Sequence, residues 1–354
     1  MPRQMASDKN KTGSTMKAST ISLLGACLLA TSAHAETVTL KIGHFLPAAS
    51  NAQANVIEPW CADLKTESNG RLECEIYPSM QLGGTPAALA DMARNGVADI
   101  VWTAPGYSAG KFPRVEALEL PFMLPYGGQA GNAIIWDYYE QYAQEDFKPF
   151  KVLALFGDGG MDIHTRDKAV SKLEDFQGLK LRASSRTAAK TLEALGATPV
   201  SMPPAQMTEA ISKGVVDGAM ATWEVVPPTK LDEVTHHHTA AMGTDRKAFG
   251  YTVLTMLMNK RKYDSMPDDL KGILDRHSGK ALSERFGTAW DQAMGEALEA
   301  APQGSVASID DAAYQAMQQA AAKVPEAWAA DMTDKGLDGH ALVDGVRQLA
   351  GTER

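Results

Sequence analysis

A serine flanked by glycines is the first residue whose setting could support catalysis. Residues 106–110 read Gly-Tyr-Ser-Ala-Gly, the Gly-x-Ser-x-Gly pattern of a hydrolase nucleophile elbow. That elbow needs a strand leading directly in and a helix leading directly out. Here Pro105 precedes the motif and Pro113 follows it closely, which disfavours both. We therefore predict a loop without a catalytic nucleophile, in which Tyr107 is a candidate ligand contact.

Three consecutive histidines, residues 236–238, suggest a metal site at first sight. Successive side chains on a strand point to opposite faces, so the three cannot converge on one ion. We expect an exposed polar strand or turn instead. The glycines of residues 157–160 lack the following lysine and helix of a phosphate loop, and no zinc-protease, EF-hand or Cys-x-x-Cys motif occurs. The sequence thus predicts no catalytic set, no metal site and no cofactor.

Arg182, Thr222 and Trp223 lie where a binding site is expected in an α/β sheet. Between residues 179 and 223 the apolar pattern alternates between strand and helix periods, which is typical of β-α-β-α-β and a mostly parallel sheet. Ligands bind such sheets beyond the carboxyl ends of the strands. Arg182 ends the first strand, and Thr222 and Trp223 follow the third. We expect one cation and one large ring to face the same crevice, although core packing is the alternative for Trp223.

The same pattern occurs once earlier, between residues 38 and 102. His44 and Phe45 follow its first strand, and Trp102 and Tyr107 follow its third, so these four are candidate ligand contacts as well. Core packing is again the alternative for the aromatic rings.

The two β-α-β-α-β units predict two lobes, each with a mixed sheet and flanking helices. We assign residues 36–160 and about 246–270 to lobe I, and residues 161–245 to lobe II. Residues 271–354 would form a long helix that packs across both lobes, followed by C-terminal helices. This long helix falls within a strongly helical stretch from residue 268 to residue 300. Met161 and Phe249, near the predicted crossings between the lobes, are further candidate ligand contacts.

The first 35 residues are predicted to be a leader rather than part of the fold. Lys17 precedes an apolar run, and the small residues Ala33 and Ala35 frame a cleavage site, as in a secretory signal peptide. We expect translation to start at Met16 and cleavage to follow Ala35. Acylation of Cys27, as in a lipoprotein, is the alternative.

Two cysteines, Cys61 and Cys74, remain after that cleavage. An even pair in an exported chain favours a disulfide, with two buried thiols as the alternative. The chain carries a net charge of −9, which argues against nucleic acid as a partner.

Three motifs in order carry a resemblance to a known family. Residues 178–182 (Gly-Leu-Lys-Leu-Arg), 195–200 (Leu-Gly-Ala-Thr-Pro-Val) and 214–218 (Gly-Val-Val-Asp-Gly) resemble the DctP-type solute-binding subunits of TRAP transporters. The resemblance implies a periplasmic two-lobe binding protein that closes on a small organic acid. It also implies delivery to a small and a large integral-membrane subunit. Arg182 would then form a bidentate salt bridge with the ligand carboxylate, to which its planar guanidinium is suited.

The sequence departs from the family at two positions that bear on the ligand. Many members carry another arginine in the segment that matches residues 160–163, and an asparagine shortly after Val-Asp-Gly. This chain has Met161 and Asp162 in the first segment and Met-Ala-Thr at residues 220–222. We therefore predict a monocarboxylate with an aromatic or apolar body, such as an aromatic or 2-oxo acid. The alternatives are a sugar acid or other hydroxy acid, a binding protein for an ATP-driven importer, and a secreted α/β enzyme.

Overall fold

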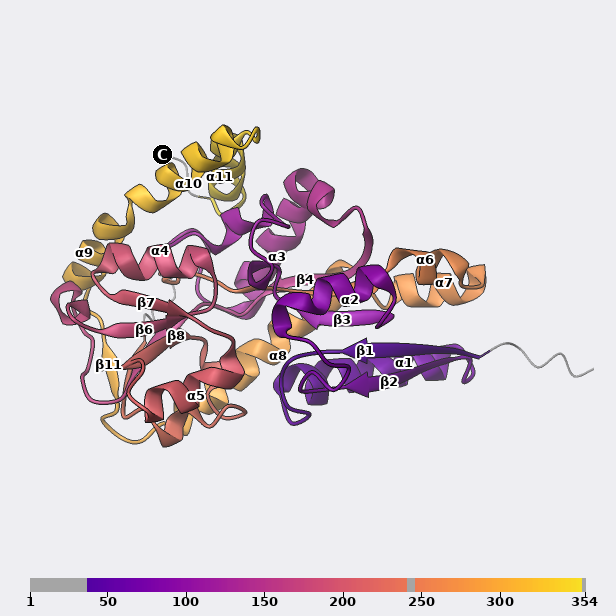
Figure 1. Cartoon of the computed structure of the whole chain (residues 1–354), viewed down its shortest axis with the longest axis horizontal. Coiled ribbons are helices and arrows are strands. Elements are labelled where there is room, and N and C mark those ends of the chain that lie inside the picture. Colours follow the sequence, from indigo (N-terminus) through magenta and orange to yellow (C-terminus); the bar gives the residue numbers. More distant parts are fainter. Residues whose placement is uncertain (1–36, 241–245, 352–354) are drawn as a thin grey trace, which may run out of the picture. The chain divides into compact units, whose positions relative to one another are not determined.

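The computed structural model describes residues 37–240 and 246–351 (Figure 1). The predicted signal peptide, with its cleavage site after Ala35 and the question of Cys27, lies outside the described residues. No helix in the described ranges is long and apolar enough to cross a membrane.

The first sheet has five strands in the order β2-β1-β3-β10-β4. Its strands are β1 (Val38–Gly43), β2 (Leu72–Tyr77), β3 (Ile100–Thr103), β4 (Phe150–Gly157) and β10 (Val253–Asn259). β1 pairs in parallel with β2 and β3, whereas β10 runs antiparallel to β3 and β4. β10 begins only at Val253, because residues 250–252 belong to a crossing segment.

The second sheet has six strands in the order β11-β9-β5-β8-β6-β7. Its strands are β5 (Asp162–Thr165), β6 (Lys180–Ala183), β7 (Thr198–Ser201), β8 (Gly218–Ala221), β9 (His237–Ala240) and β11 (Val306–Ser308). β6 pairs in parallel with β7 and β8, while β5 is antiparallel to β8 and β9. The predicted α/β fold, two mixed sheets with flanking helices, is confirmed.

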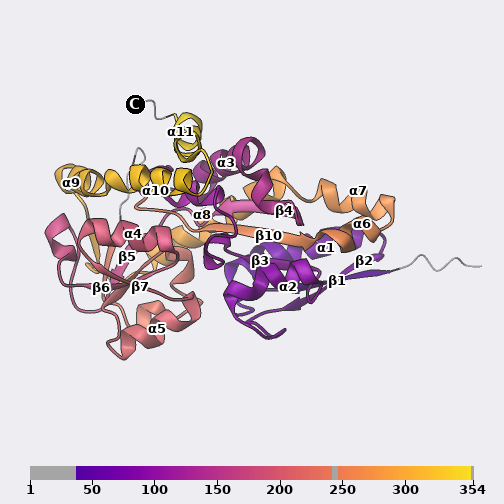
Figure 2. The same cartoon turned by 45° about the horizontal axis from the view of Figure 1, so that its top comes forward.

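Helices cover both sheets. α1 (Glu58–Glu67), α2 (Leu89–Asn95) and α3 (Gly128–Tyr138) accompany the first sheet, and α4 (Arg186–Leu195) and α5 (Pro204–Ser212) lie on opposite sides of the second (Figure 1, Figure 2). Local signals fix α4: Ser185 accepts a hydrogen bond from the Ala188 amide at its start, and Gly196 ends it in the left-handed region. This cap places α4 directly after β6, the strand that carries Arg182.

The chain crosses between the sheets in two segments that lie side by side. Residues 158–161 leave β4 for β5, and residues 250–252 lead into β10. The amide of Asp158 donates to the Thr252 carbonyl oxygen and that of Met161 to the Gly250 carbonyl oxygen, each at 3.1 Å. The lobe boundaries remain a prediction.

The long helix predicted over residues 268–300 is in fact two helices, α7 (Asp268–Arg276) and α8 (Lys280–Glu299). Gly279 adopts a positive φ of 76° between them, which a continuous helix cannot contain. α8 packs against α3 and β4 and also against the 3₁₀ turn η8 (Trp223–Val225), which follows the second sheet's strand β8. After α6 (Lys260–Ser265), α7 and α8, the chain ends in α9 (Asp311–Ala321), α10 (Lys323–Asp334) and α11 (Gly339–Leu349).

The predicted disulfide is present. Cys61 of α1 is bonded to Cys74 of β2, with 5.9 Å between their Cα atoms. The bond ties the first helix to the edge strand of the five-stranded sheet.

Candidate binding site

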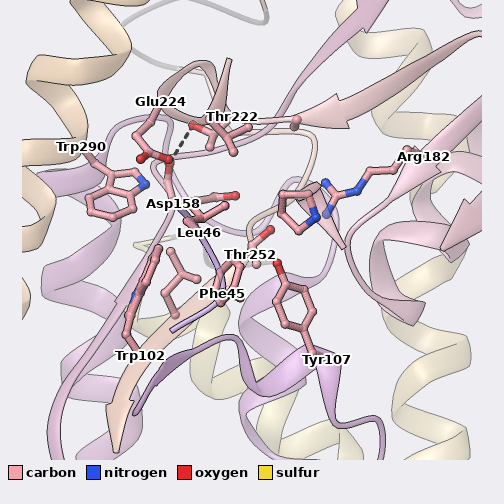
Figure 3. Close-up of a pocket in the computed structure, with 14 residues that line it drawn as sticks. Phe45, Leu46, Trp102, Tyr107, Asp158, Arg182, Thr222, Glu224, Thr252 and Trp290 are labelled. Carbon is pink, nitrogen blue, oxygen red and sulfur yellow. Dashed lines mark hydrogen bonds between the residues drawn. The ribbon is translucent and has the colours of Figure 1, made fainter. Parts of the chain in front are cut away.

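A cavity lies among residues from both sheets (Figure 3). Five of the predicted site residues line it, namely Phe45, Trp102, Tyr107, Arg182 and Thr222. Nine further lining residues were not predicted, namely Leu46, Asp158, Pro204, Ala221, Glu224, Val225, Thr252, Leu254 and Trp290.

Arg182 is the cation of this cavity. Its side chain is 3% exposed, and its Nε and Nη1 atoms donate to the carbonyl oxygens of Met202 (2.9 Å) and Met220 (3.3 Å). Nη2 is buried and has no hydrogen-bond partner among the described residues. Burial lowers the pKa of Arg182, while Tyr107 and Asp158 act in the opposite direction. The ordinary pKa of arginine is so high that the guanidinium stays charged despite this lowering. The unpaired Nη2 atom is therefore a charged donor for an anion.

Aromatic rings form the wall beside this cation. Phe45 stacks on Trp102 with 4.8 Å between ring centroids. Phe45 and Tyr107 make an edge-to-face contact with 5.3 Å between ring centroids. Trp102 in turn contacts Trp290 of α8 at 6.2 Å. The hydroxyl of Tyr107 points toward Arg182 in Figure 3, and burial raises the pKa of that hydroxyl to about 12. A planar apolar body next to a carboxylate matches this wall.

Two buried acids complete the lining. Asp158, 3% exposed, accepts a hydrogen bond from the Gly160 amide at 3.1 Å, and burial raises its pKa to about 6. Glu224, 4% exposed, has a pKa raised to about 8 by burial and secondarily by Asp158. Thr222 donates from its hydroxyl to the Asp158 carbonyl oxygen at 3.0 Å, which joins β8 to the crossing segment. No lysine or second arginine lines this cavity in the described part of the chain.

Trp223, predicted to face the ligand, does not line the cavity. Its ring packs on the rings of His164 and His238, with centroid distances of 4.9 Å and 5.0 Å, and the residue is 1% exposed. The 3₁₀ turn after β8 sends the next two side chains, Glu224 and Val225, to the cavity instead. Trp223 is therefore packed in the core, which is the alternative given above.

Three other predicted residues also lie outside the lining. His44 is buried, and its Nε2 atom lies 2.8 Å from Oε1 of Gln53. Phe249 packs against Phe122 at 5.7 Å between ring centroids. Met161 is fully buried, and its sulfur accepts a hydrogen bond from the Ser184 hydroxyl. Each was predicted from its place near a strand end or crossing, but its side chain points into the core.

The histidine run is only partly exposed, contrary to our expectation of an exposed strand or turn. His238 on β9 is 2% exposed, and its Nδ1 atom lies 2.9 Å from Nδ1 of His164. Nε2 of His164 lies 3.1 Å from the Ala221 carbonyl oxygen, which can only accept, so Nε2 carries the ring proton of His164. Nδ1 of His164 is then the acceptor, and Nδ1 of His238 donates to it. No group of three metal-ligating side chains occurs among residues 37–240 and 246–351.

The serine of the Gly-x-Ser-x-Gly motif lies in a turn. Pro105–Tyr107 form a short 3₁₀ helix, and the hydroxyl of Ser108 donates to the Ala87 carbonyl oxygen at 2.8 Å. The predicted loop is therefore present, with Tyr107 on its cavity side.

Residues 42–331 match the family model described as bacterial extracellular solute-binding protein, family 7 (DctP). The chain belongs to this family. The predicted resemblance to solute-binding subunits of TRAP transporters is confirmed.

Solved structures of family members share the fold over most of the chain. A TRAP solute-binding protein from Rhodoferax ferrireducens T118, in complex with copurified benzoate, is 39% identical, with a TM-score of 0.86 over 89% of this chain and 98% of its own. A marine metagenome TRAP solute-binding protein specific for aromatic acids, bound to 3-hydroxybenzoate, is 40% identical, with a TM-score of 0.85 over the same shares. A periplasmic TRAP solute-binding protein from Bordetella bronchiseptica, with bound (R)- and (S)-mandelate, is 26% identical, with a TM-score of 0.80 over 89% and 99%.

Proposed function

We propose that this protein is the periplasmic solute-binding subunit of a TRAP transporter and that its ligand is a small aromatic monocarboxylate. The observation that carries the proposal is the buried guanidinium of Arg182, which has a free Nη2 atom beside a wall of aromatic rings. The ligand carboxylate binds Arg182, and the ring of the ligand lies against Phe45 and Trp102. The aromatic acids bound by related proteins support this ligand class.

The single cation limits the charge of the ligand. A dicarboxylate would place its second carboxylate near Asp158 and Glu224, with no further cation in the described lining. Burying an unpaired charge is costly, so dicarboxylates should bind poorly. This argument supports the prediction, from Met161 and residues 220–222, that anchors for a second carboxylate are absent.

Transport follows from closure of the two lobes on the ligand. The paired crossing segments, residues 158–161 and 250–252, are the proposed hinge, and both Asp158 and Thr252 line the cavity. Ligand contacts to both sheets bias the protein toward the closed state. The closed protein then docks on a small and a large integral-membrane subunit, after a signal peptide cleaved behind Ala35 has directed export.

A ligand screen tests this proposal. Purified protein is heated with benzoate, mandelate, succinate or gluconate, and the thermal midpoint is measured. A ligand at 100 times its dissociation constant should stabilise the folded state by about 2.7 kcal/mol. We expect stabilisation by benzoate or mandelate and none by succinate, with the acid recovered unchanged by mass spectrometry. Stabilisation by gluconate or succinate alone would contradict the aromatic class, and chemical conversion of the acid would contradict a binding function.

A further inference from the structure

Four buried polar atoms of the cavity-lining residues have no hydrogen-bond partner in the described part of the chain. They are Nη2 of Arg182, the indole Nε1 atoms of Trp102 and Trp290, and Oε1 of Glu224. Glu224 and Trp290 are 4% and 1% exposed. Buried polar groups are nearly always hydrogen-bonded, because leaving one unpaired is costly. Nη2 of Arg182 is the proposed donor to the ligand carboxylate. Oε1 of Glu224 and Nε1 of Trp290 then indicate that a ligand supplies a second set of partners elsewhere in the cavity.

These two groups lie together and away from Arg182. Glu224 belongs to the turn η8 and Trp290 to helix α8, and these elements pack against each other. In Figure 3 the indole nitrogen of Trp290 is turned toward the Glu224 carboxyl group, while Arg182 lies across the cavity. The rings of Phe45 and Trp102 line the space between the two ends. A ligand held by Arg182 therefore presents its far side to Glu224 and Trp290.

The chemistry of the pair selects an uncharged group. Burial and the nearby Asp158 raise the pKa of Glu224 to about 8, so at pH 7 its carboxyl group is mostly protonated and can both donate and accept. The Trp290 indole can only donate, so its partner must have a lone pair. An ammonium group has none, and a carboxylate would be a buried anion next to Asp158. A hydroxyl group on the ligand can serve both residues. Its oxygen accepts a hydrogen bond from the Trp290 indole, and it can donate to or accept from the Glu224 carboxyl group.

We infer that Glu224 and Trp290 form a polar subsite for a hydroxyl group on the ring of the bound acid. The preferred ligands are thus hydroxylated aromatic monocarboxylates. This inference rests on the proposed function, because Arg182 must first orient the carboxylate. Glu224 and Trp290 then set specificity at the opposite end of the cavity.

Calorimetric titration at pH 7 tests the subsite with benzoate, 3-hydroxybenzoate, 4-hydroxybenzoate and the 3- and 4-methylbenzoates as isosteric controls. We expect the wild-type protein to bind one hydroxybenzoate about 10-fold more tightly than the matching methylbenzoate, as for one or two buried hydrogen bonds. Glu224→Met should reduce this ratio to about 1 or reverse it. Glu224→Gln keeps a donor and an acceptor and should retain most of the ratio. Trp290→Phe should lower it as well.

Glu119→Gln is the matched control, since Glu119 is a second buried acid that does not line the cavity. It should leave the hydroxyl-to-methyl ratio at its wild-type value. Circular dichroism shows which variants fold, and Glu224→Gln and Trp290→Phe still give the ratio if Glu224→Met does not fold. A wild-type protein that binds benzoates without preferring a hydroxyl, or a ratio that survives in folded Glu224→Met, overturns only this inference. Absence of binding by every benzoate would overturn the proposed function together with it.

Discussion

The Nε atom of Arg182 donates to the carbonyl oxygen of Met202 at 2.9 Å, so the backbone holds the guanidinium in place before any ligand arrives. Nη1 is held in the same way by the carbonyl oxygen of Met220, whereas Nη2 has no partner among the described residues. Met202 follows β7 and Met220 lies on β8, the two neighbours of the strand that carries Arg182. Such pre-organisation spares a ligand the cost of ordering the side chain.

Substitution of Arg182 should abolish tight binding of benzoate-type acids. Arg182→Met removes the only cation of the described lining and should weaken binding at least 100-fold, because a buried charged hydrogen-bonded pair contributes about 3 kcal/mol or more. Arg182→Lys keeps a charge but loses the planar fork, so an intermediate loss is expected. Calorimetric titration measures both. The control is Arg166→Met, which removes an arginine that does not line the cavity. Wild-type affinity in Arg182→Met would show that the carboxylate binds elsewhere.

Stability should decrease as the pH rises from 7 to 9. Burial raises the pKa of both Glu119 and Glu224 to about 8, so the folded protein holds protons that the unfolded chain has already released above its own pKa of about 4.5. Each group then lowers the free energy of unfolding by up to about 1.4 kcal/mol per pH unit until the pH passes the folded pKa. Urea denaturation at pH 7, 8 and 9 measures this slope.

Glu119→Gln should make that slope shallower. The Glu119 carboxyl group accepts a hydrogen bond from the Val253 amide at 3.1 Å, which the glutamine oxygen can still accept. The exposed Glu209→Gln is the control and should leave the slope as it is. A stability that is constant or increasing over this range in the wild-type protein would contradict the assignment of these acids as protonated.

The buried histidine pair should affect stability on the acid side. Burial lowers the pKa of His164 to about 3 and that of His238 to about 4, whereas an unfolded histidine takes up its proton near pH 6.5. The pair therefore contributes full stability above pH 6.5, and this contribution falls as the pH drops toward 4.

Comparison of His238→Asn with the wild type isolates this effect, because the other titrating groups cancel in the difference. Asparagine keeps a donor near Nδ1 of His164 but cannot titrate. We expect the variant to gain stability relative to the wild type by about 1 kcal/mol between pH 7 and 5, measured by urea denaturation. The exposed neighbour His236→Asn serves as control. A difference that does not change with pH would argue against a buried neutral pair.

Loss of the disulfide should destabilise the protein without changing its ligand. Cys61 and Cys74 are 13 residues apart, and closing a loop of this size stabilises by about 3 kcal/mol in the chain-entropy model. The double variant Cys61→Ser/Cys74→Ser should lose about that much in urea denaturation. Its benzoate affinity, measured at low temperature, should match the wild type because neither cysteine lines the cavity. Equal stability with and without reducing agent would contradict a structural bond.

Strand periods, helix caps and strand ends were predictable because they depend on neighbouring residues. The alternation around residues 179–223 located β6, β7 and β8, and the carboxyl-end rule brought Arg182 and Thr222 to the cavity. The even pair of exported cysteines was likewise sufficient to predict the disulfide. The break between α7 and α8 could also have been found, since Gly279 is a common helix-ending residue.

The direction of individual side chains was decided only by the tertiary structure. Trp223 and Glu224 are adjacent in a 3₁₀ turn, yet the ring packs on His164 and the acid faces the cavity. A 3₁₀ turn this short has no repeating side-chain pattern in the sequence. Contacts with β5 and α8 therefore decide which of its side chains enters the core and which faces the cavity. Trp290 shows the same limit, because only the packing of α8 against η8 brings it to a site some 110 residues away from Arg182 in sequence. The sequence alone therefore determined the fold class, the family and the position of Arg182 at the cavity. Long-range packing determined the opposite end of the cavity, because burial there depends on segments that meet only in the folded chain.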